Sequence, residues 1–448
     1  MSHVKPPQIL GFTRYQWLVI FAAWLGWGFD VFDALLFNFV SRLCIPSLLG
    51  VEKVDAQTSI YWTGTLTGLL LIGWATGGIL FGKITDKIGR TRTLMLTMLT
   101  YALATAACAF SVNIWMLAIF RFISSLGIGG EWAAGAALVA ESVPEKKRVH
   151  AGALLYTAAP AGLFLATFVT DLFTRQLTGI ASNPDLSWRV VFLTGLIPAS
   201  VALAIRWKVR EPEGWKPAVE QPRIRELFTP QLRARTIGGI CLAASALITW
   251  WSCNAFIPLI CSFLVHDVVP QPGAAELALL KASFVTKGTT AFNIGGLLGT
   301  LLTIPIALHV GRRPMFIGYF LASAAAIWCT FHLGLAPETR LYSIFFIGLS
   351  VFGIFGSFTF YLPELFPTRL RGTGSGFTYN VARYLTAFGP FLVADIASHT
   401  TSSDQILGVV SWVAIVPLVG VLLLLLGIGV ETRGAAQEVQ VQTEKLAA

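Results

Sequence analysis

Five ionisable side chains stand inside long apolar stretches of this sequence, where each of them costs free energy. They are Asp30, Asp33, Arg121, Glu131 and Arg383. A charge at the centre of a membrane-spanning helix costs about 2.5–3.5 kcal/mol on insertion scales, and such residues usually face a bundle interior and serve ions or substrates. These five residues are therefore the first candidates for the chemistry of the chain.

Asp30 and Asp33 lie three positions apart in "GWGFDVFDALLFNFV". On an α-helix they project about 60° apart, on one broad face. Two carboxylates beside one guanidinium, here that of Arg121, can hold a single exchangeable proton. We assign proton exchange to Asp30 and pairing with Arg121 to Asp33; the alternative is a purely structural ion pair between Asp33 and Arg121. Glu131 either carries the proton or clamps its helix to a neighbour.

Arg383 lies in "FTYNVARYLTAFGP", among the polar residues Tyr379, Asn380 and Tyr384. A planar guanidinium binds a carboxylate through two parallel hydrogen bonds, and neighbouring amide and hydroxyl groups fix its orientation. This pattern predicts an anionic substrate; the alternative is an ion pair between Arg383 and Glu131.

Two further residues, Asn254 and Asn293, are secondary candidates for substrate contacts. For either of them, a hydrogen bond between helices is at least as good an explanation.

The composition indicates a membrane protein. Of the 448 residues 55% are hydrophobic and 12% charged, and the mean hydropathy is +0.70. Soluble domains have about 25% charged residues. A bilayer core requires about 20 apolar residues per helix, and twelve segments meet that length: 16–40, 59–81, 93–111, 114–140, 151–172, 188–207, 236–264, 284–308, 314–333, 341–363, 373–395 and 406–429.

The distribution of basic residues predicts the orientation of these segments. With both termini in the cytoplasm, the inner segments hold 23 Lys and Arg and the outer loops hold seven. Cytoplasmic loops are enriched in basic residues. The net charge of +9 therefore reflects membrane topology, with the lipid bilayer as partner and no nucleic acid. We expect a multi-pass protein of the cell inner (plasma) membrane.

The chain divides into two similar halves. The charged stretch 208–235 cannot span a membrane, which predicts an N-terminal six-helix bundle (1–207), a cytoplasmic linker (208–235), a C-terminal six-helix bundle (236–430) and a cytoplasmic tail (431–448). The pattern E-x-x-P-x-x-x-R occurs at Glu141–Arg148 and again 223 positions later at Glu364–Arg371. Internal repeats of this size indicate two bundles that rock about a central site.

Over essentially its whole length the chain resembles the major facilitator superfamily. "GKITDKIGRTR", with Gly82, Asp86, Gly89 and Arg90, is similar to the family's signature between helices 2 and 3, and "RFISSLGIGGEW" to its helix-4 pattern. The resemblance implies an all-α membrane fold of twelve helices in two pseudo-symmetric bundles. In the second half, Leu308 and His309 replace the acidic-basic pair, so we expect an asymmetric gating contact.

The loop signature is suited to a latch between conformations, although positive-inside anchoring alone would also explain its basic residues. The gating residues that the repeat and the signature together indicate are Gly82, Asp86, Gly89, Arg90, Glu141, Arg148, Glu364 and Arg371. The D-x-F-D pattern of helix 1 is similar to proton symporters of organic acids, both the sialate/lactate and the aromatic-acid branches. The expected function is proton-coupled symport of a small mono- or dicarboxylate, by a monomer without a cofactor other than the proton.

Other classes of function find less support. A neutral sugar-like solute would leave Arg383 uncompensated, and the short tails and linker supply no output domain for a transporter-like sensor. The six His and six Cys show no metal-ligand spacing, no phosphate-binding loop is present, and no nucleophile–base pair emerges, so we expect neither an enzyme nor a metal site.

Overall fold

The computed structural model describes residues 8–9, 11–51, 56–209, 223–268, 274–387, 407–408 and 411–432. Residues 210–222 of the predicted linker and 433–448 of the predicted tail lie outside these residues. The described part is almost entirely helical, apart from a short antiparallel hairpin in which Gln8 pairs with Thr13 and Ile9 with Phe12. The predicted all-α fold is confirmed.

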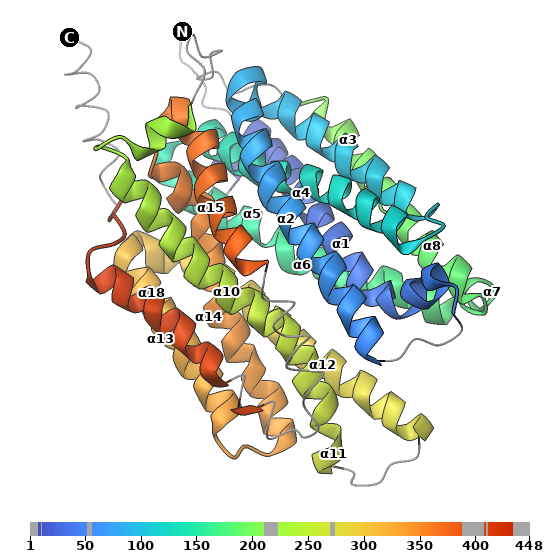
Figure 1. The fold of residues 1–448 in the computed structure, drawn as a ribbon. Helices are drawn as coiled ribbons and strands as arrows, with labels where there is room; N and C mark the ends of the chain where they lie inside the picture. Colours follow the sequence, from blue (N-terminus) through green and yellow to red (C-terminus); the bar gives the residue numbers. More distant parts are fainter. Residues whose placement is uncertain are drawn as a thin grey trace, which may run out of the picture. The chain divides into compact units, whose positions relative to one another are not determined.

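The first half of the chain forms a hairpin and then a series of helices (Figure 1). Its elements are β1 (Gln8–Ile9), β2 (Phe12–Thr13), α1 (Arg14–Leu49), α2 (Ala56–Ile88), α3 (Arg90–Cys108), α4 (Ile114–Ser142), η1 (Glu145–Lys147), α5 (Arg148–Tyr156), α6 (Ala158–Asp171), η2 (Leu172–Gln176), α7 (Thr178–Ala181), α8 (Pro184–Thr194) and α9 (Leu196–Arg206).

The second half repeats the pattern of long helices after a short 3-10 turn. Its described elements are η3 (Ile224–Phe228), α10 (Arg233–Phe263), α11 (Val265–Val268), α12 (Ala274–His309), α13 (Arg312–His332), α14 (Pro337–Glu364), η4 (Thr368–Leu370), α15 (Arg371–Thr386), η5 (Trp412–Ala414) and α18 (Ile415–Leu425).

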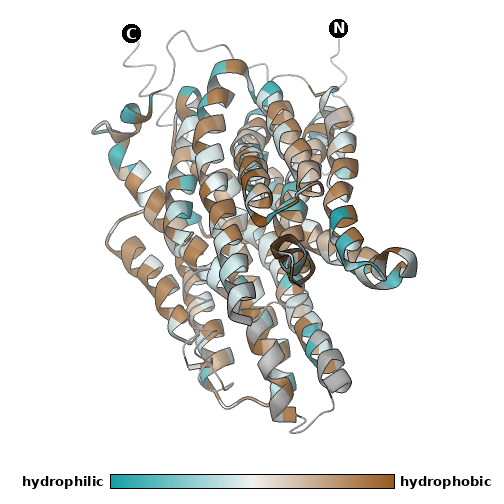
Figure 2. Ribbon diagram, turned by 45° about the vertical axis from the view of Figure 1, so that its right-hand side comes forward, coloured by the Kyte–Doolittle hydropathy of each residue, from teal (hydrophilic) through white to brown (hydrophobic). Residues whose placement is uncertain are grey.

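Among the described residues, nine helices are long and apolar enough to cross a membrane, and Trp412–Leu425 is a shorter apolar helix. Figure 2 shows hydrophobic residues along most of the length of the helices. Helix α3 has 19 residues, but its arginines and threonines make it less apolar than the nine. The predicted segment 373–395 is described only as far as residue 387, at the end of α15.

Local sequence signals explain where several helices begin and bend. Thr13 and Gln16 form a capping box at the start of α1, each side chain accepting a hydrogen bond from the backbone of the other. The predicted helix 151–172 is interrupted at Thr157, between α5 and α6. Pro160 has no amide hydrogen, so the carbonyl of Tyr156 loses its helical partner at this point.

Contacts divide the chain into two compact units that do not follow the two sequence halves. Unit 1 comprises Met1–Lys53, Gly73–Leu227 and Leu362–Asn380, and unit 2 comprises Val54–Ile72, Phe228–Tyr361 and Val381–Ala448. The boundaries cut α2 after Ile72 and α15 after Asn380, so these two helices each contribute to both units.

The internal repeat of the sequence is also a repeat of hydrogen bonds. In unit 1 the guanidinium of Arg90 donates to the carbonyl of Thr85 (3.2 Å), and in unit 2 that of Arg312 donates to the carbonyl of Ala307 (3.1 Å). Each arginine follows a glycine with positive φ, Gly89 at 109° and Gly311 at 105°. An L side chain rarely adopts this conformation, so the sharp turn before each helix requires glycine.

The E-x-x-P-x-x-x-R repeat has a matching pair of contacts. Nε of Arg148 donates to the carbonyl of Ala140 (2.9 Å), and Nε of Arg371 donates to that of Pro363 (3.1 Å). In both cases the arginine folds back onto the end of the preceding long helix and satisfies a carbonyl that has no further helical turn to bond it.

Candidate transport site

Asp33, in the middle of α1, is a buried carboxylate of unit 1 that is hydrogen-bonded to two neighbouring helices. Its side chain is 1% exposed, and its Oδ2 accepts hydrogen bonds from the hydroxyls of Thr105 (2.7 Å) and Ser124 (2.9 Å). Those two hydroxyls lie 3.0 Å from each other, on α3 and α4. Three helices therefore meet at one carboxylate.

Arg121 of α4 lies against the same turn of α1 and is fully buried. Its guanidinium donates to the backbone carbonyls of Asp33 (3.2 Å) and Ala34 (2.9 Å), and its Nη1 lies 3.9 Å from Oδ1 of Asp33. The rings of Phe37 and Phe192 flank it, at 5.8 and 6.0 Å. Such packing excludes water and strengthens the attraction between guanidinium and carboxylate.

Asp30 and Glu131 are buried in the same unit, each 1% exposed. Asp30 lies one turn before Asp33 on α1, so two acidic side chains lie close in sequence on this helix. The hydroxyl of Thr97, on α3, donates to Oε2 of Glu131 (3.1 Å). Glu131 thus links α4 to α3, which agrees with the clamping alternative without excluding a role in proton transfer.

The glycines that precede Glu131 let α4 approach its neighbours closely. A Cβ added to Gly129 would lie 1.9 Å from the carbonyl oxygen of Trp74, and one added to Gly127 would lie 2.6 Å from that of Thr97. No side chain fits at either place. The G-x-G-G pattern in helix 4 therefore fixes the positions of Arg121 and Glu131 relative to α2 and α3.

The predicted gating residues of unit 1 gather around Glu141, at the end of α4. Arg90 binds this carboxylate with two parallel bonds of 3.0 Å, from Nε to Oε2 and from Nη2 to Oε1. Nη1 of Arg371 lies 3.9 Å from Oε1 of Glu141. Burial, followed by the charge of Arg148, lowers the pKa of Arg371, whereas Glu141 and Glu364 oppose that effect.

Three other members of the predicted gating set lie on α2 and at the end of α14. Gly82 on α2 faces α15, where an added Cβ would lie 3.2 Å from the carbonyl oxygen of Gly372. Glu364 is half-buried at the end of α14. The side chain of Asp86 lies outside the described residues, although its backbone is part of α2.

The corresponding turn of unit 2 uses a carboxylate that the sequence patterns do not indicate. Glu431 accepts hydrogen bonds from the backbone N–H groups of Arg312 (3.0 Å) and Arg313 (2.9 Å), at the start of α13. The guanidinium of Arg313 donates to the carbonyl of Leu424 (3.1 and 2.6 Å). An anion at a helix N-terminus is favourable, so the segment after the last helix caps α13. Its position directly after the final apolar segment is the only signal that could have indicated it.

Tyr361 holds that same segment in place. Its hydroxyl donates to the carbonyl of Val430 (3.1 Å) and accepts from the N–H of Val430 (3.2 Å). The chain reaches this position through Gly427 and Gly429, which have φ values of 84° and 127°. The end of the described chain is therefore an ordered part of unit 2.

The predicted substrate residues of α15 divide between the units. Tyr379 and Asn380 belong to unit 1, and Arg383 and Tyr384 to unit 2. The amide nitrogen of Asn380 donates to the carbonyl of Gly376 (2.7 Å), and its side chain occupies the place of a Cβ on Gly78 of α2. Arg383 is 3% exposed.

The two other predicted asparagines lie in unit 2. The amide nitrogen of Asn254 donates to the carbonyl of Trp250, one turn back on α10 (3.0 Å). Asn293, on α12, is 4% exposed, and its Oδ1 has no hydrogen-bond partner. Among the described residues, no group of three or more His, Cys, Asp or Glu could hold a metal ion.

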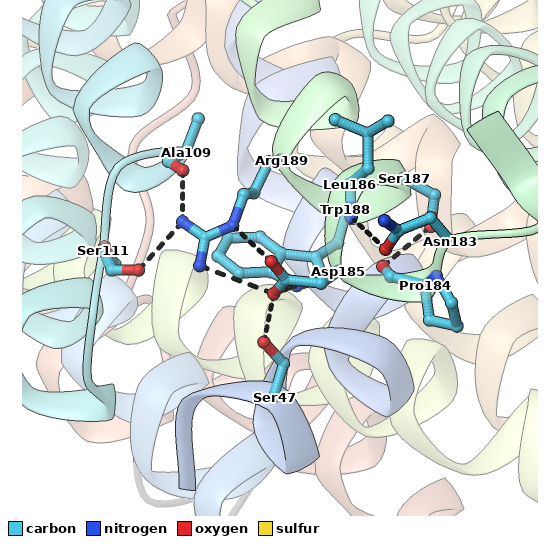
Figure 3. Close-up of polar contacts among 10 residues, drawn as sticks. All are labelled: Ser47, Ala109, Ser111, Asn183, Pro184, Asp185, Leu186, Ser187, Trp188 and Arg189. Carbon is cyan, nitrogen blue, oxygen red and sulfur yellow. Dashed lines mark hydrogen bonds and ion pairs between the residues drawn. The ribbon is translucent and has the colours of Figure 1, made fainter. Parts of the chain in front are cut away.

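A separate polar network joins helix ends in unit 1 (Figure 3). Asp185, at the start of α8, accepts hydrogen bonds from Ser47 at the end of α1, from the indole of Trp188 (3.2 Å) and from Arg189 (3.1 Å). Arg189 also donates to the carbonyls of Ala109 (2.6 Å) and Ser111 (3.0 Å), beyond the end of α3. This network fixes the ends of α1, α3 and α8 together, at the opposite end of α3 from Arg90.

Long apolar helices with charges buried between them define a multi-pass membrane transporter. The family model of the Major Facilitator Superfamily matches residues 17–390. The chain belongs to the Major Facilitator Superfamily, as the sequence motifs predicted, and it is a transporter and not an enzyme.

Curated relatives are named as transporters of organic acids. The chain is 27% identical to the sialic acid transporter NanX of Escherichia coli K12, covering 95% of each chain. It is 28% identical to the cis,cis-muconate transport protein of Acinetobacter baylyi, covering 82% of this chain and 86% of the relative.

Among solved structures, the chain is similar to the proton:xylose symporter XylE of E. coli bound to 6-bromo-6-deoxy-D-glucose. The TM-score is 0.70 and the identity 16%, over 93% of this chain and 96% of XylE. At this identity the similarity shows the fold alone, that of twelve membrane-spanning helices in two bundles.

Proposed function

We propose that this protein imports a small organic anion together with protons, by alternating access across the inner membrane, with both termini in the cytoplasm. The names of the sialic acid and cis,cis-muconate relatives support an organic acid as substrate. The observation that carries proton coupling is Asp33, a buried carboxylate within 3.9 Å of a buried guanidinium and hydrogen-bonded to two hydroxyls.

We assign the exchangeable proton to Asp33, which differs from the assignment to Asp30 that the sequence pattern suggested. Oδ2 of Asp33 is occupied by the hydroxyls of Thr105 and Ser124, whereas Oδ1 has no hydrogen-bond partner and faces Arg121 at 3.9 Å. A proton on Oδ1 would therefore cancel the attraction to Arg121 without breaking the two hydroxyl bonds.

Protonation of Asp33 would act on the contact between α1 and α4. With Asp33 ionised, Arg121 is held by the carboxylate and by two backbone carbonyls of α1. With Asp33 neutral, only the carbonyl bonds remain, and the two helices can separate at lower cost. A charge change at one buried site thereby shifts the balance between two conformations.

The cluster at Glu141 supplies the second control point. Arg90 and Arg371 both approach this carboxylate, and Arg371 comes from the part of α15 that belongs to unit 1. In our proposal these contacts hold α15 while the cytoplasmic side is closed and break when it opens. The carboxylate of the substrate would meet Arg383, about three helical turns beyond the gating residue Arg371 on α15.

A neutral sugar-like solute is the competing substrate class. The E-x-x-P-x-x-x-R repeats fit it equally well, but the names of the sialic acid and cis,cis-muconate relatives favour an anion. We propose a monomer as the transporting unit, with the proton as coupling ion and no cofactor.

Reconstituted protein tests this proposal. Proteoliposomes with an inward proton gradient are expected to accumulate labelled cis,cis-muconate or sialate above the equilibrium level, and an ionophore that dissipates the gradient should abolish accumulation. Uptake that is unaffected by both pH gradient and membrane potential would contradict symport. Uptake of a neutral sugar in place of both acids would contradict the carboxylate substrate.

A further inference from the structure

The side chain of Gln16, in the first turn of α1, has two different hydrogen-bond partners. Its Oε1 accepts from the backbone N–H of Thr13 (3.0 Å), and its Nε2 donates to the carbonyl of Ser142 (3.2 Å), the last residue of α4. An amide oxygen only accepts and an amide nitrogen only donates, so the two partners together fix the orientation of the side chain. Gln16 therefore ties the start of α1 to the end of α4, within unit 1.

Only one of these two bonds belongs to the helix cap. Glutamate and glutamine both complete a capping box, because the box uses the side-chain oxygen alone. A glutamate at position 16 would have no N–H to donate to the carbonyl of Ser142. The amide nitrogen of Gln16 therefore does something that the start of α1 does not require.

The hairpin before α1 contacts the same turn of the chain at its other end. Phe12 of β2 is buried, and Nζ of Lys147, in η1, lies 5.8 Å from the centre of its ring. A Cβ added to Gly11, at the turn of the hairpin, would lie 2.5 Å from Nζ of Lys147. The chain between Ser142 and Lys147 is thus held against the N-terminal hairpin and the first turn of α1.

Glu141, the carboxylate at the centre of the predicted gate, directly precedes this turn. The guanidinium of Arg90 donates two bonds of 3.0 Å to its two oxygens. A carboxylate accepts two parallel bonds from one guanidinium only in a narrow range of orientations. A bond that fixes the carbonyl of Ser142, the next residue, restrains that orientation.

The internal repeat indicates that the turn can form without this bond. The positions 222 and 223 residues beyond Gln16 are Gly238 and Gly239, which have no side chain. The second copy of the E-x-x-P-x-x-x-R pattern nevertheless has the bond from Arg371 to the carbonyl of Pro363. Formation of the turn is therefore not a sufficient explanation for the second bond of Gln16.

We propose that Gln16 is a positioning residue for the cytoplasmic gate. Its bond to the carbonyl of Ser142 holds Glu141 in the orientation that the arginines of the gate bind, and so favours the conformation that is closed to the cytoplasm. Because α1 also carries Asp33, the same bond links the helix of the proton site to the gate. This inference rests on the proposed function, in which the contacts of Glu141 keep the cytoplasmic side closed.

Gln16→Glu tests the proposal, because it keeps the capping box and removes the donor to Ser142. Hydrogen exchange should become faster at residues 142–148 and stay unchanged at residues 16–19. The KM for proton-driven uptake of labelled cis,cis-muconate into proteoliposomes should rise about three-fold. This follows if loss of the bond shifts an evenly balanced equilibrium about five-fold, which lowers the outward-open fraction from about one half to about one sixth.

Thr13→Val is the matched control, because it removes the other half of the capping box, the bond from the N–H of Gln16 to the hydroxyl of Thr13 (3.2 Å). It should give the opposite pattern, with faster exchange at residues 16–19, unchanged exchange at residues 142–148 and the wild-type KM. Wild-type exchange at residues 142–148 in Gln16→Glu would overturn the proposal, and so would a KM that rises equally in both variants.

A double variant separates a role in the gate from a general loss of stability. Glu141→Gln removes the carboxylate through which Gln16 acts, so adding Gln16→Glu should not raise the KM further; effects that multiply would overturn the proposal. If Gln16→Glu does not fold, Lys147→Met replaces it, since it removes the ammonium group above Phe12. It too should raise the KM, and only while Glu141 is present.

Failure of the proposed function has a different signature. The wild-type protein would then accumulate no cis,cis-muconate in response to a proton gradient, while exchange at residues 142–148 would still distinguish Gln16→Glu from Thr13→Val. Proton-driven uptake with the same KM in the wild-type protein and in Gln16→Glu would overturn the positioning role and leave the proposed function standing.

Discussion

The two units differ in the side chains that they bury. In unit 1 buried acidic and basic side chains contact one another, as Asp33 contacts Arg121 and Glu141 contacts Arg90. In unit 2 the surroundings of Trp250 are aromatic, with rings from α10, α12 and α14 close together. A buried charge network suits proton binding, whereas an aromatic wall suits the carbon skeleton of a ligand. We infer that unit 1 couples transport to protons and unit 2 selects the substrate.

The two helix turns that repeat between the units sharpen this contrast. In both, an arginine after a positive-φ glycine bonds a carbonyl five residues back. In unit 1 the carboxylate of Glu141 binds the side chain of Arg90, but in unit 2 the carboxylate of Glu431 binds the backbone of Arg312 and Arg313. In unit 1 both partners are side chains, whereas in unit 2 the donors are backbone N–H groups that the start of α13 holds in place.

The largest effect is expected from Asp33→Asn. This change removes the proton site and keeps the size and the hydrogen bonds from Thr105 and Ser124, so uptake driven by a proton gradient should fall to the level of empty liposomes. Exchange of labelled for unlabelled substrate should continue, because it requires no net proton movement. Asp30→Asn is the control, and loss of gradient-driven uptake in that variant alone would reverse the roles of the two residues.

Arg383→Gln is expected to weaken binding of the anion roughly 10- to 100-fold, the loss that follows when a charge-assisted hydrogen-bonded pair is removed. The measurement is the affinity of the purified protein for cis,cis-muconate by calorimetry. If affinity is retained, the carboxylate is bound elsewhere. The assignment of substrate recognition to unit 2 would then lose its main support, which is carboxylate binding by Arg383.

Glu141→Gln and Glu431→Gln compare the two turns directly. Removing the charge of Glu141 leaves the buried guanidinium of Arg90 uncompensated, which should destabilise unit 1 by about 3 kcal/mol. Removing that of Glu431 loses an interaction with a helix N-terminus and should cost about 0.5–1 kcal/mol. Melting temperatures of the two variants, measured side by side, test the difference. Equal losses would contradict the distinction between the turns.

The smallest effect concerns the contact between Glu226 of η3 and Arg369 of η4, within unit 1. Burial alone would raise the pKa of Glu226, but the hydrogen bonds from Arg369 and from the N–H of Arg223 outweigh it and lower the pKa below 4.5. The contact therefore stabilises η3 at pH values above 4.5 and is lost as the pH falls through the lowered pKa.

Hydrogen exchange of residues 224–228 measures that dependence. Their amides should lose protection under acid in the wild-type protein, relative to the intrinsic exchange rate. In Glu226→Gln protection should be low and independent of pH over the same range. Acid-sensitive protection that persists in the variant would exclude Glu226 as its cause.

Much of the fold and of the buried charge network could be predicted from the sequence. Hydropathy and charge show directly whether a segment lies in lipid or in water. The helices, the repeat and the buried charges follow from such patterns, and the pairing of Asp33 with Arg121 follows from their depths in two helices. Thr105 and Ser124 could not be identified, since a single hydroxyl in an apolar helix usually bonds its own backbone. Glu431 binds backbone groups, so its position directly after the final apolar segment is the one sequence signal for it.

The sequence could not predict that α2 and α15 would each contribute residues to both compact units. Hydropathy finds the ends of a helix but not the point at which its neighbours change. The close approach of Asn380 to Gly78 depends on side chains from helices about 300 positions apart in the chain. The predicted substrate role of Asn380 therefore stays a prediction, while its observed contact is with α2.

Substrate-induced proton movement tests the central claim most directly. When cis,cis-muconate is added to the purified protein in weakly buffered solution with a pH-sensitive dye, the account predicts that wild-type protein and Asp30→Asn take up protons and that Asp33→Asn does not. Proton uptake by Asp33→Asn that equals the wild-type amount would contradict it, because the coupling proton would then reside on another group.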